Sequence, residues 1–303
     1  MPARSRTITP HRTPIMESPM PTPVRIGIIN RTINMLDFLL ADHASIYADN
    51  GLAPSFDTLA GKESIDALLA GDLDFVVSIG AAARAIMQDN APVRAALLVH
   101  RNAPHWLMAN DSIASSAVLK GLKVQAAQPG SEPDVMVQKW LTANGLNPQT
   151  DVELVYQRAH PGWKEDGPDP EEDAVIARTL EQEVLEAKGY HTLVDLCEAY
   201  PNTLVHGLIV TERTIAERPE LVDAMVASHR QVATWIDEAR PQVLDFIQQT
   251  WNVSPERAQR AVKALNSRFT ARLEPSDFET VIASSAIALN KPPIPVDRLI
   301  APR

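Results

Sequence analysis

The stretch LLAGDLDFVVSIGAAARAIMQ occupies residues 68–88 and contains a strand between two helices. Its first residues have the apolar spacing of a helix that ends at Gly71, residues 74–80 predict a buried strand, and residues 81–88 return to a helical pattern. A strand between helices of this length is typical of a βαβ crossover, in which a helix joins two parallel strands. The stretch therefore predicts an α/β fold.

The same alternation continues on both sides of this stretch. Further strands are predicted at residues 24–29, 54–60 and 93–100, and a second series at residues 105–110, 122–128, 151–157, 191–196 and 204–210. We expect two α/β units with parallel pairing inside each. The rest of the chain predicts helices, one of which is capped by Ser254 and begins at Pro255.

Two segments have compositions that do not suit a packed element. Residues 1–23 are rich in proline and predict a disordered leader. Residues 158–173 combine prolines and glycines with crowded carboxylates, and predict a surface loop. The leader also lacks the apolar core of about 7–15 residues that a secretory signal needs. The sequence as written therefore predicts a cytoplasmic protein, or a periplasmic one if its true start lies elsewhere.

Composition excludes several classes of protein. Hydrophobic residues make up 45% of the 303 residues, which is a globular proportion. The net charge of −10 argues against a general nucleic-acid binder, and no apolar run approaches the ~18 residues of a membrane span. The single cysteine, Cys197, cannot form an internal disulfide or a cysteine-based zinc site. No other cluster has metal-ligand spacing, so we expect no metal and no cofactor.

Four stretches together resemble a known family. They are VRIGI at residues 24–28, the run at 68–80, LKGLKVQAAQPGSEPDVMVQKWLTANGL at 119–146 leading into DVELVY at 151–156, and TERTIAERPELV at 211–222. In this order they resemble the type II periplasmic-binding-protein superfamily, in the branch of nitrate-, sulfonate- and taurine-binding proteins and hydroxymethylpyrimidine proteins (SsuA/THI5-like). Members of this family bind small molecules, often for an ABC transporter, and a minority are enzymes.

The resemblance implies two α/β lobes that close on a ligand in the cleft between them. Lobe one would comprise residues 24–102 and a helical C-terminal return over 206–303, and lobe two would comprise residues 103–205. The chain departs from the family in lacking a signal peptide or lipoprotein cysteine. The acidic loop at 158–173 also replaces a helix that the family usually has before the last strand of lobe two.

Candidate ligand-binding residues follow from strand positions, because ligands of open α/β sheets bind beyond the carboxyl ends of the strands. The four loops there contain Asn30, Arg31, Thr32 and Asn34; Ser78, Gly80 and Ala81; Gly130 and Ser131; and Arg178 and Thr179. Arginine recognises carboxylates or sulfonates through its forked guanidinium, and helix N-termini favour anions. The alternative is that these residues only cap helices, form tight turns or face solvent.

His100 and Arg101 lie at the expected crossover between the lobes and complete the set of candidate binding residues. The alternative is that His100 has a structural role and hydrogen-bonds only to backbone groups. We assign no catalytic residue. The sequence therefore predicts a solute-binding protein of the ABC-transporter type for a small organic anion or a polar heterocycle, with an ABC permease as a candidate partner.

The alternative function is a cytoplasmic enzyme on the same fold, of a decarboxylase, lyase or pyrimidine-pathway type. His100, His105 and Asp37 would be its first candidates for acid–base work. A thiolate enzyme would need a cysteine in the cleft, whereas the context of Cys197 predicts a buried thiol. The sequence favours the binding protein.

Overall fold

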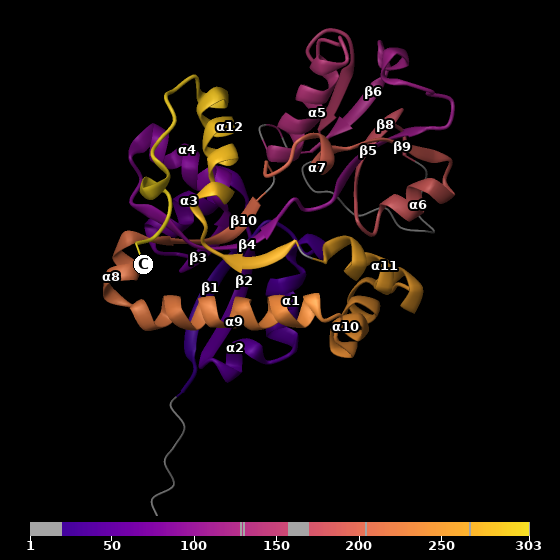
Figure 1. Ribbon diagram of the computed structural model, residues 1–303. Coiled ribbons are helices and arrows are strands. Elements are labelled where there is room, and N and C mark those ends of the chain that lie inside the picture. The colour runs from indigo at the N-terminus through magenta and orange to yellow at the C-terminus, as the bar shows by residue number, and fades with distance from the viewer. Residues whose placement is uncertain are drawn as a thin grey trace, which may run out of the picture.

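A computed structural model describes residues 20–127, 129, 131–156, 170–203, 205–266 and 268–302. Their strands form two sheets that lie in separate parts of the molecule (Figure 1). We call the six-stranded sheet with its helices lobe one, and the five-stranded sheet with its helices lobe two. The α/β class and the two-lobed architecture predicted from the sequence are confirmed.

The sheet of lobe one has the strand order β11-β4-β10-β3-β1-β2. Its strands are β1 (Thr22–Ile28), β2 (Leu52–Thr58), β3 (Phe75–Ser78), β4 (Val93–Arg101), β10 (Val205–Thr211) and β11 (Phe269–Arg272). β1 pairs in parallel with β2 and β3, whereas β10 is antiparallel to both β3 and β4. A strand from the last third of the chain thus lies at the centre of the sheet.

The sheet of lobe two has the order β7-β6-β8-β5-β9. Its strands are β5 (His105–Asn110), β6 (Lys123–Ala126), β7 (Glu153–Tyr156), β8 (Ala174–Arg178) and β9 (Tyr190–Asp195). β6 pairs in parallel with β7 and β8, but β5 is antiparallel to both β8 and β9. The expectation of parallel pairing throughout each unit is therefore wrong, because β4, β5, β9, β10 and β11 pair with neighbouring strands only in the antiparallel sense.

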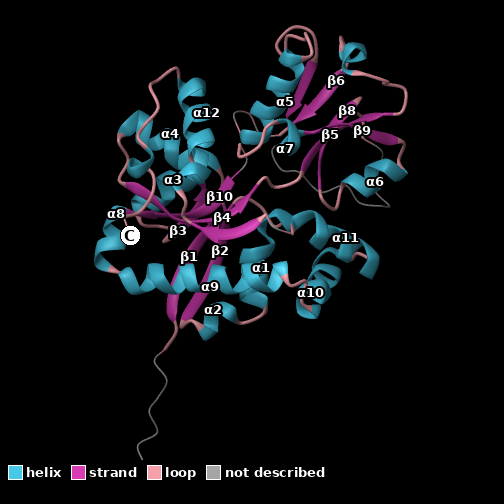
Figure 2. Cartoon of the chain, viewed as in Figure 1, coloured by secondary structure: helices cyan, strands magenta, loops and turns pink. Residues whose placement is uncertain are grey.

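Helices cover both faces of each sheet (Figure 2). One face of lobe one packs against α1 (Leu36–His43), α2 (Ile46–Asp49), α9 (Pro219–Asp237), α10 (Pro241–Trp251) and α11 (Pro255–Leu265), and the other against α3 (Gly61–Ala70), α4 (Ile79–Asp89) and α12 (Glu279–Leu289). In lobe two, α5 (Glu132–Ala143) and α7 (Leu196–Ala199) pack on one face and α6 (Gln182–Ala187) on the other. The chain also contains α8 (Glu212–Glu217) and single 3-10 turns at Ile33–Met35, Ser116–Leu119, Pro275–Asp277 and Val296–Arg298.

Strand periodicity explains why both faces are apolar. Phe75 and Val77 of β3 belong to the cluster under α1 and α9, while Val76 between them belongs to the cluster under α4. Successive side chains of a strand point to opposite faces, so a strand covered by helices on both sides reads as a continuous apolar run. This is the pattern that identified residues 74–80 as a buried strand.

Some predicted features lie outside the described residues. Residues 1–19 of the expected leader and residues 158–169 of the acidic loop belong to this group, and so does Gly130. β1 begins at Thr22, two residues before the expected strand. Among the described residues, no helix is long and apolar enough to cross a membrane.

Candidate functional site

A row of side chains crosses the sheet of lobe one at its junction with lobe two. Ser78 at the end of β3 pairs with His206 of β10, His206 pairs with His100 of β4, and His100 pairs with Phe269 of β11. Directly opposed residues of antiparallel strands project from the same face. The His100 ring stacks on Phe269 with centroids 4.5 Å apart, and its centroid lies 5.9 Å from that of His206. We call these four residues the hinge row.

A bulge in β10 fixes the position of His206 in this row. The register between β10 and β4 shifts between His206 and Gly207. A Cβ on Gly207 would lie 2.2 Å from the carbonyl oxygen of Leu97, so the backbones approach more closely than a side chain permits. Glycine is therefore required at residue 207 to place His206 opposite both Ser78 and His100.

The histidines of the hinge row are buried and neutral at physiological pH. Both ring nitrogens of His100 and Nδ1 of His206 have no hydrogen-bond partner among the described residues. Burial lowers the pKa of His206 to about 4, and burial, followed by the neighbouring His206, lowers the pKa of His100 well below its ordinary value. A neutral imidazole has one donor and one acceptor, so the row presents hydrogen-bonding edges without net charge.

Lobe two adds a second polar group beside the row. His105 of β5 pairs with Arg178 of β8, and its Nδ1 lies 2.8 Å from the Ala103 carbonyl oxygen. Burial lowers the pKa of His105 to about 3. The guanidinium of Arg178 is held by Glu181 through contacts of 2.8–3.2 Å, and both side chains are buried. The positive charge of Arg178 is therefore balanced inside the protein.

The N-termini of α4 and α5 meet across the two lobes. Ser78 caps α4 by accepting a hydrogen bond from the Ala81 backbone N–H at 3.4 Å. A Cβ on Gly80 would lie 1.8 Å from Oε1 of Glu132, the first residue of α5, and the same carboxylate oxygen is 3.4 Å from Nη1 of Arg84. The N-terminus of α4, where an anion would be favoured, thus already has a carboxylate of lobe two against it.

Several buried polar atoms that follow strands of the two lobes have no hydrogen-bond partner among the described residues. Besides the histidine nitrogens, they are Oδ1 of Asn34, Oγ of Ser131 and Oγ1 of Thr179. Asn34 follows β1, Ser131 follows β6 and caps α5 without a side-chain hydrogen bond, and Thr179 follows β8. Unpartnered buried polar atoms are costly and rare in proteins, so a concentration of them beyond strand ends is typical of a ligand site.

The remaining predicted residues lie elsewhere or have local partners. Asn30 Oδ1 accepts hydrogen bonds from the backbone N–H and the hydroxyl of Thr32, at 3.0 and 2.6 Å. Arg31 is exposed, with its guanidinium 5.9 Å from the centroid of the Phe56 ring. Arg101 forms a 3.4 Å ion pair with Asp277 and lines a separate cavity. The binding roles of these residues stay predictions.

His206 and Glu132 were not singled out from the sequence. In the sequence, His206 lies between a polar segment and an apolar run. The neighbouring residues do not indicate that it pairs with His100, because that pairing depends on the order of the strands in the sheet. Glu132 has the sequence context of an ordinary first-turn acid. Glu132 lies in the site only because the N-termini of α4 and α5, which belong to different lobes, meet there.

Cys197 is a buried thiol, as predicted. Its Sγ donates to the Ala103 carbonyl oxygen at 2.9 Å, and burial raises its pKa to about 12. A thiol of this kind does not provide a thiolate nucleophile at neutral pH. Among the described residues there is no group of three or more His, Cys, Asp or Glu side chains able to hold a metal ion.

Comparisons with known proteins agree with this architecture. A model of the NMT1-like family matches residues 17–158. A search of the curated proteins gives no match. The alkanesulfonate-binding protein SsuA from Xanthomonas axonopodis pv. citri, solved bound to MOPS, is 15% identical with a TM-score of 0.69, over 93% of this chain and 97% of that one.

Two further solved structures extend the comparison. The periplasmic aliphatic sulphonate binding protein SsuA from Escherichia coli is 15% identical with a TM-score of 0.70, over 92% of this chain and 97% of that one. The desulfurization enzyme DSZB is 15% identical with a TM-score of 0.61, over 93% and 97% of the two chains. The chain therefore has the fold of the type II periplasmic binding proteins, and its residues 17–158 resemble the NMT1-like family.

Proposed function

We propose that this protein is a solute-binding protein that closes its two lobes on a small polar ligand. The proposal rests on unpartnered buried polar atoms that both lobes contribute, on Asn34, His100, Ser131, Thr179 and His206. His100 and His206 lie on β4 and β10, and the other three follow strands of both lobes. A ligand that supplied their missing hydrogen bonds would be held by both lobes at once and would favour the closed arrangement.

The charges at the junction favour a polar heterocycle over a strong anion. The hinge-row histidines are neutral, the guanidinium of Arg178 is balanced by Glu181, and Glu132 brings a carboxylate to the N-terminus of α4. A heterocycle with ring nitrogens and carbonyl oxygens has the mixed donors and acceptors that neutral imidazoles, hydroxyls and an amide recognise. A sulfonate or carboxylate would meet the carboxylate of Glu132 instead.

The test is a thermal-shift screen followed by calorimetry. We expect stabilisation by pyrimidines or related heterocycles, about 2.7 kcal/mol at 100 times the dissociation constant, with the ligand recovered unchanged by mass. The His206→Phe variant should lose this stabilisation, whereas His191→Phe, a change on β9, should keep it. Stabilisation by sulfonates or carboxylates alone would refute the ligand class. Consumption of the ligand would instead show the enzyme alternative.

Delivery of the ligand to an ABC permease belongs to the same proposal. The support is that the solved proteins with this fold include sulfonate-binding proteins, one of them described as periplasmic. Delivery requires export, so fractionation of cells that make the native protein should recover it outside the cytoplasm. Recovery only from the cytoplasm would contradict transport and leave binding inside the cell as the function.

A further inference from the structure

A cavity of about 370 Å³ opens where the chain passes between the lobes, and its walls belong to both of them. Arg101 and Asn102 line it from the end of β4, where the chain leaves lobe one. Glu198 of α7 contributes from lobe two, and Lys263 and Arg268 contribute from the end of α11 and the segment before β11. We call this cavity the hinge pocket.

The charge of the hinge pocket is opposite to that of the whole chain. Arg101, Lys263 and Arg268 carry positive charges, and Glu198 carries the negative charge. The chain as a whole has a net charge of −10. A local excess of positive side chains in an acidic protein attracts anions to that place and not to the rest of the surface.

Hydrogen bonds hold the Arg268 guanidinium at the edge of the pocket. Its Nε donates to the Ala264 carbonyl oxygen at 2.8 Å, and its Nη1 donates to the carbonyl oxygen of Asn102. Both partners line the same pocket. Because these acceptors are neutral carbonyls, they orient the guanidinium without neutralising its positive charge. Nη2 of Arg268 has no hydrogen bond to a described residue.

The charge of Arg101 is also incompletely balanced. Its Nη1 lies 3.4 Å from Oδ1 of Asp277, whereas Arg272 holds both oxygens of that carboxylate at 2.6 and 2.7 Å. Lys263 is exposed and makes no ion pair with a described residue. The pocket therefore has one oriented guanidinium, a second that is weakly paired and an exposed ammonium, which together suit a doubly charged oxyanion.

We propose that the hinge pocket is a second binding site, which takes a small dianion of the phosphate type and contacts both lobes. Arg268 and Arg101 donate forked hydrogen bonds to its oxygens, and Lys263 neutralises it. Glu198 on the opposite wall accepts from a protonated oxygen of the anion. Since the walls belong to different lobes, the anion binds one arrangement of the lobes more tightly than others and stabilises that arrangement. The residues that line it are not those of the hinge row, so the two sites are distinct in space.

Binding is tested by calorimetry with inorganic phosphate at constant ionic strength, with chloride as the reference anion. We expect saturable binding by the native chain at pH 8, where phosphate is a dianion, and at least a tenfold loss of affinity in Lys263→Ala. The matched control is Lys123→Ala, which removes an exposed lysine at the start of β6 and should bind as the native chain does. Absence of saturable binding, or equal binding by Lys263→Ala, would overturn the proposal.

Contact with both lobes is tested by hydrogen exchange. Phosphate should slow amide exchange in both Leu196–Ala199 of α7 and Pro255–Leu265 of α11, and Lys263→Ala should abolish both effects. Protection of α11 alone would show an anion site confined to lobe one and would overturn the bridging role.

Discussion

His100, His105 and His206 combine burial with a lowered pKa, and this makes stability depend on pH. Each stays neutral when folded, because burial lowers the pKa of His206 to about 4 and of His105 to about 3 and lowers that of His100 in the same direction. In the unfolded chain each returns to about 6.5. Below pH 6.5 the unfolded chain therefore binds more protons than the folded chain, and stability falls toward acid pH.

We predict that the free energy of unfolding falls by up to about 2 kcal/mol for each of these histidines between pH 7 and pH 5. Urea unfolding at pH 7, 6 and 5 measures it. The His100→Phe variant keeps a ring beside Phe269 and removes one titrating group, so its pH dependence should be weaker by about one third. An unchanged free energy from pH 7 to pH 5 would contradict neutral histidines at the junction.

Glu132 is predicted to set the charge preference of the main cleft. Glu132→Gln removes the carboxylate from the N-terminus of α4 and should raise the affinity for carboxylate or sulfonate ligands about tenfold, while affinity for neutral heterocycles changes less. Isothermal titration of both ligand classes checks this. Glu153→Gln, at an exposed position of β7, is the control. Equal effects of the two substitutions would show that only net charge matters.

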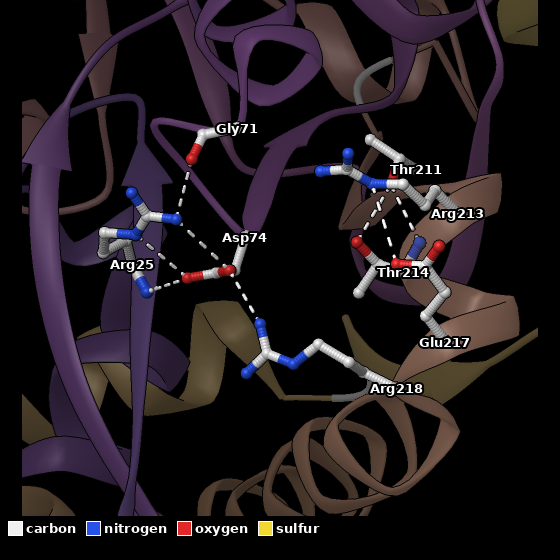
Figure 3. A network of polar contacts seen from close by, with 8 residues as sticks. All are labelled: Arg25, Gly71, Asp74, Thr211, Arg213, Thr214, Glu217 and Arg218. Carbon is white, nitrogen blue, oxygen red and sulfur yellow. Dashed lines mark hydrogen bonds and ion pairs between the residues drawn. The ribbon is translucent and has the colours of Figure 1, made fainter.

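At the scale of elements, Asp74 joins β1, β3 and the start of α9 (Figure 3). Its carboxylate accepts from the Arg25 backbone N–H at 2.8 Å and from Nε at 3.2 Å, and it contacts Nη1 of Arg218 at 3.1 Å. Figure 3 shows the two guanidinium groups on different sides of this carboxylate. A single buried carboxylate thus holds three elements together.

We predict that Asp74→Ala lowers the free energy of unfolding by about 2–4 kcal/mol, because it leaves a backbone donor and two arginines without their acceptor. Asp66→Ala removes an exposed carboxylate that forms a 2.7 Å ion pair with the exposed Lys62, and should cost less than about 1 kcal/mol. Urea unfolding of both variants measures the difference. Similar losses would show that the Asp74 contacts add little to stability.

Local sequence patterns were sufficient for most elements and not for their pairing. The apolar run at 74–80, the glycine end of α3 at Gly71 and the cap at Ser254 are signals carried by neighbouring residues, and the structure has a strand, a helix end and a helix start there. The antiparallel pairing of β4 depends on β10, more than 100 residues away in the sequence. The periodicity of apolar residues within one element cannot predict which distant strand will pair with it.

The same distinction applies to the candidate site. Asn34, Ser131 and Thr179 could be selected because loops after strands are where ligands bind, and their binding role stays a prediction. Arg31 and Arg178 were selected for their charge, but one is exposed and the other is paired with Glu181. Residue type alone does not reveal such a pair, because it depends on how the side chains pack.

At the scale of the whole molecule, ion pairs connect the lobes on the side of α6 and α11. Glu183 of α6 lies 3.2 Å from Nε of Arg257 and 2.9 Å from Nη2 of Arg260, and hydrogen bonding to Arg260 lowers its pKa. Arg257 also donates to the Leu180 carbonyl oxygen at 3.0 Å. These contacts favour the arrangement of the lobes that the structure has, even without a ligand.

Glu183→Gln should therefore shift the molecule toward an open arrangement. A loss of about 1 kcal/mol corresponds to about a fivefold change in the ratio of open to closed molecules. Small-angle scattering of the ligand-free protein should show a larger radius of gyration than for the native chain. Glu186→Gln, on the exposed side of α6, should leave it unchanged. Equal radii for native and Glu183→Gln chains would show that these pairs do not control closure.

The position of β10 between β3 and β4 has a consequence for synthesis on the ribosome. The strands of lobe two all lie between His105 and Asp195, so that sheet can form once this stretch has emerged. The sheet of lobe one lacks its central strand until Thr211 has been made. Because domains fold as units while the chain grows, the middle of this protein reaches its native form before its beginning does. Until then, β3 and β4 have exposed edges, and the nascent chain is most susceptible to aggregation during this interval.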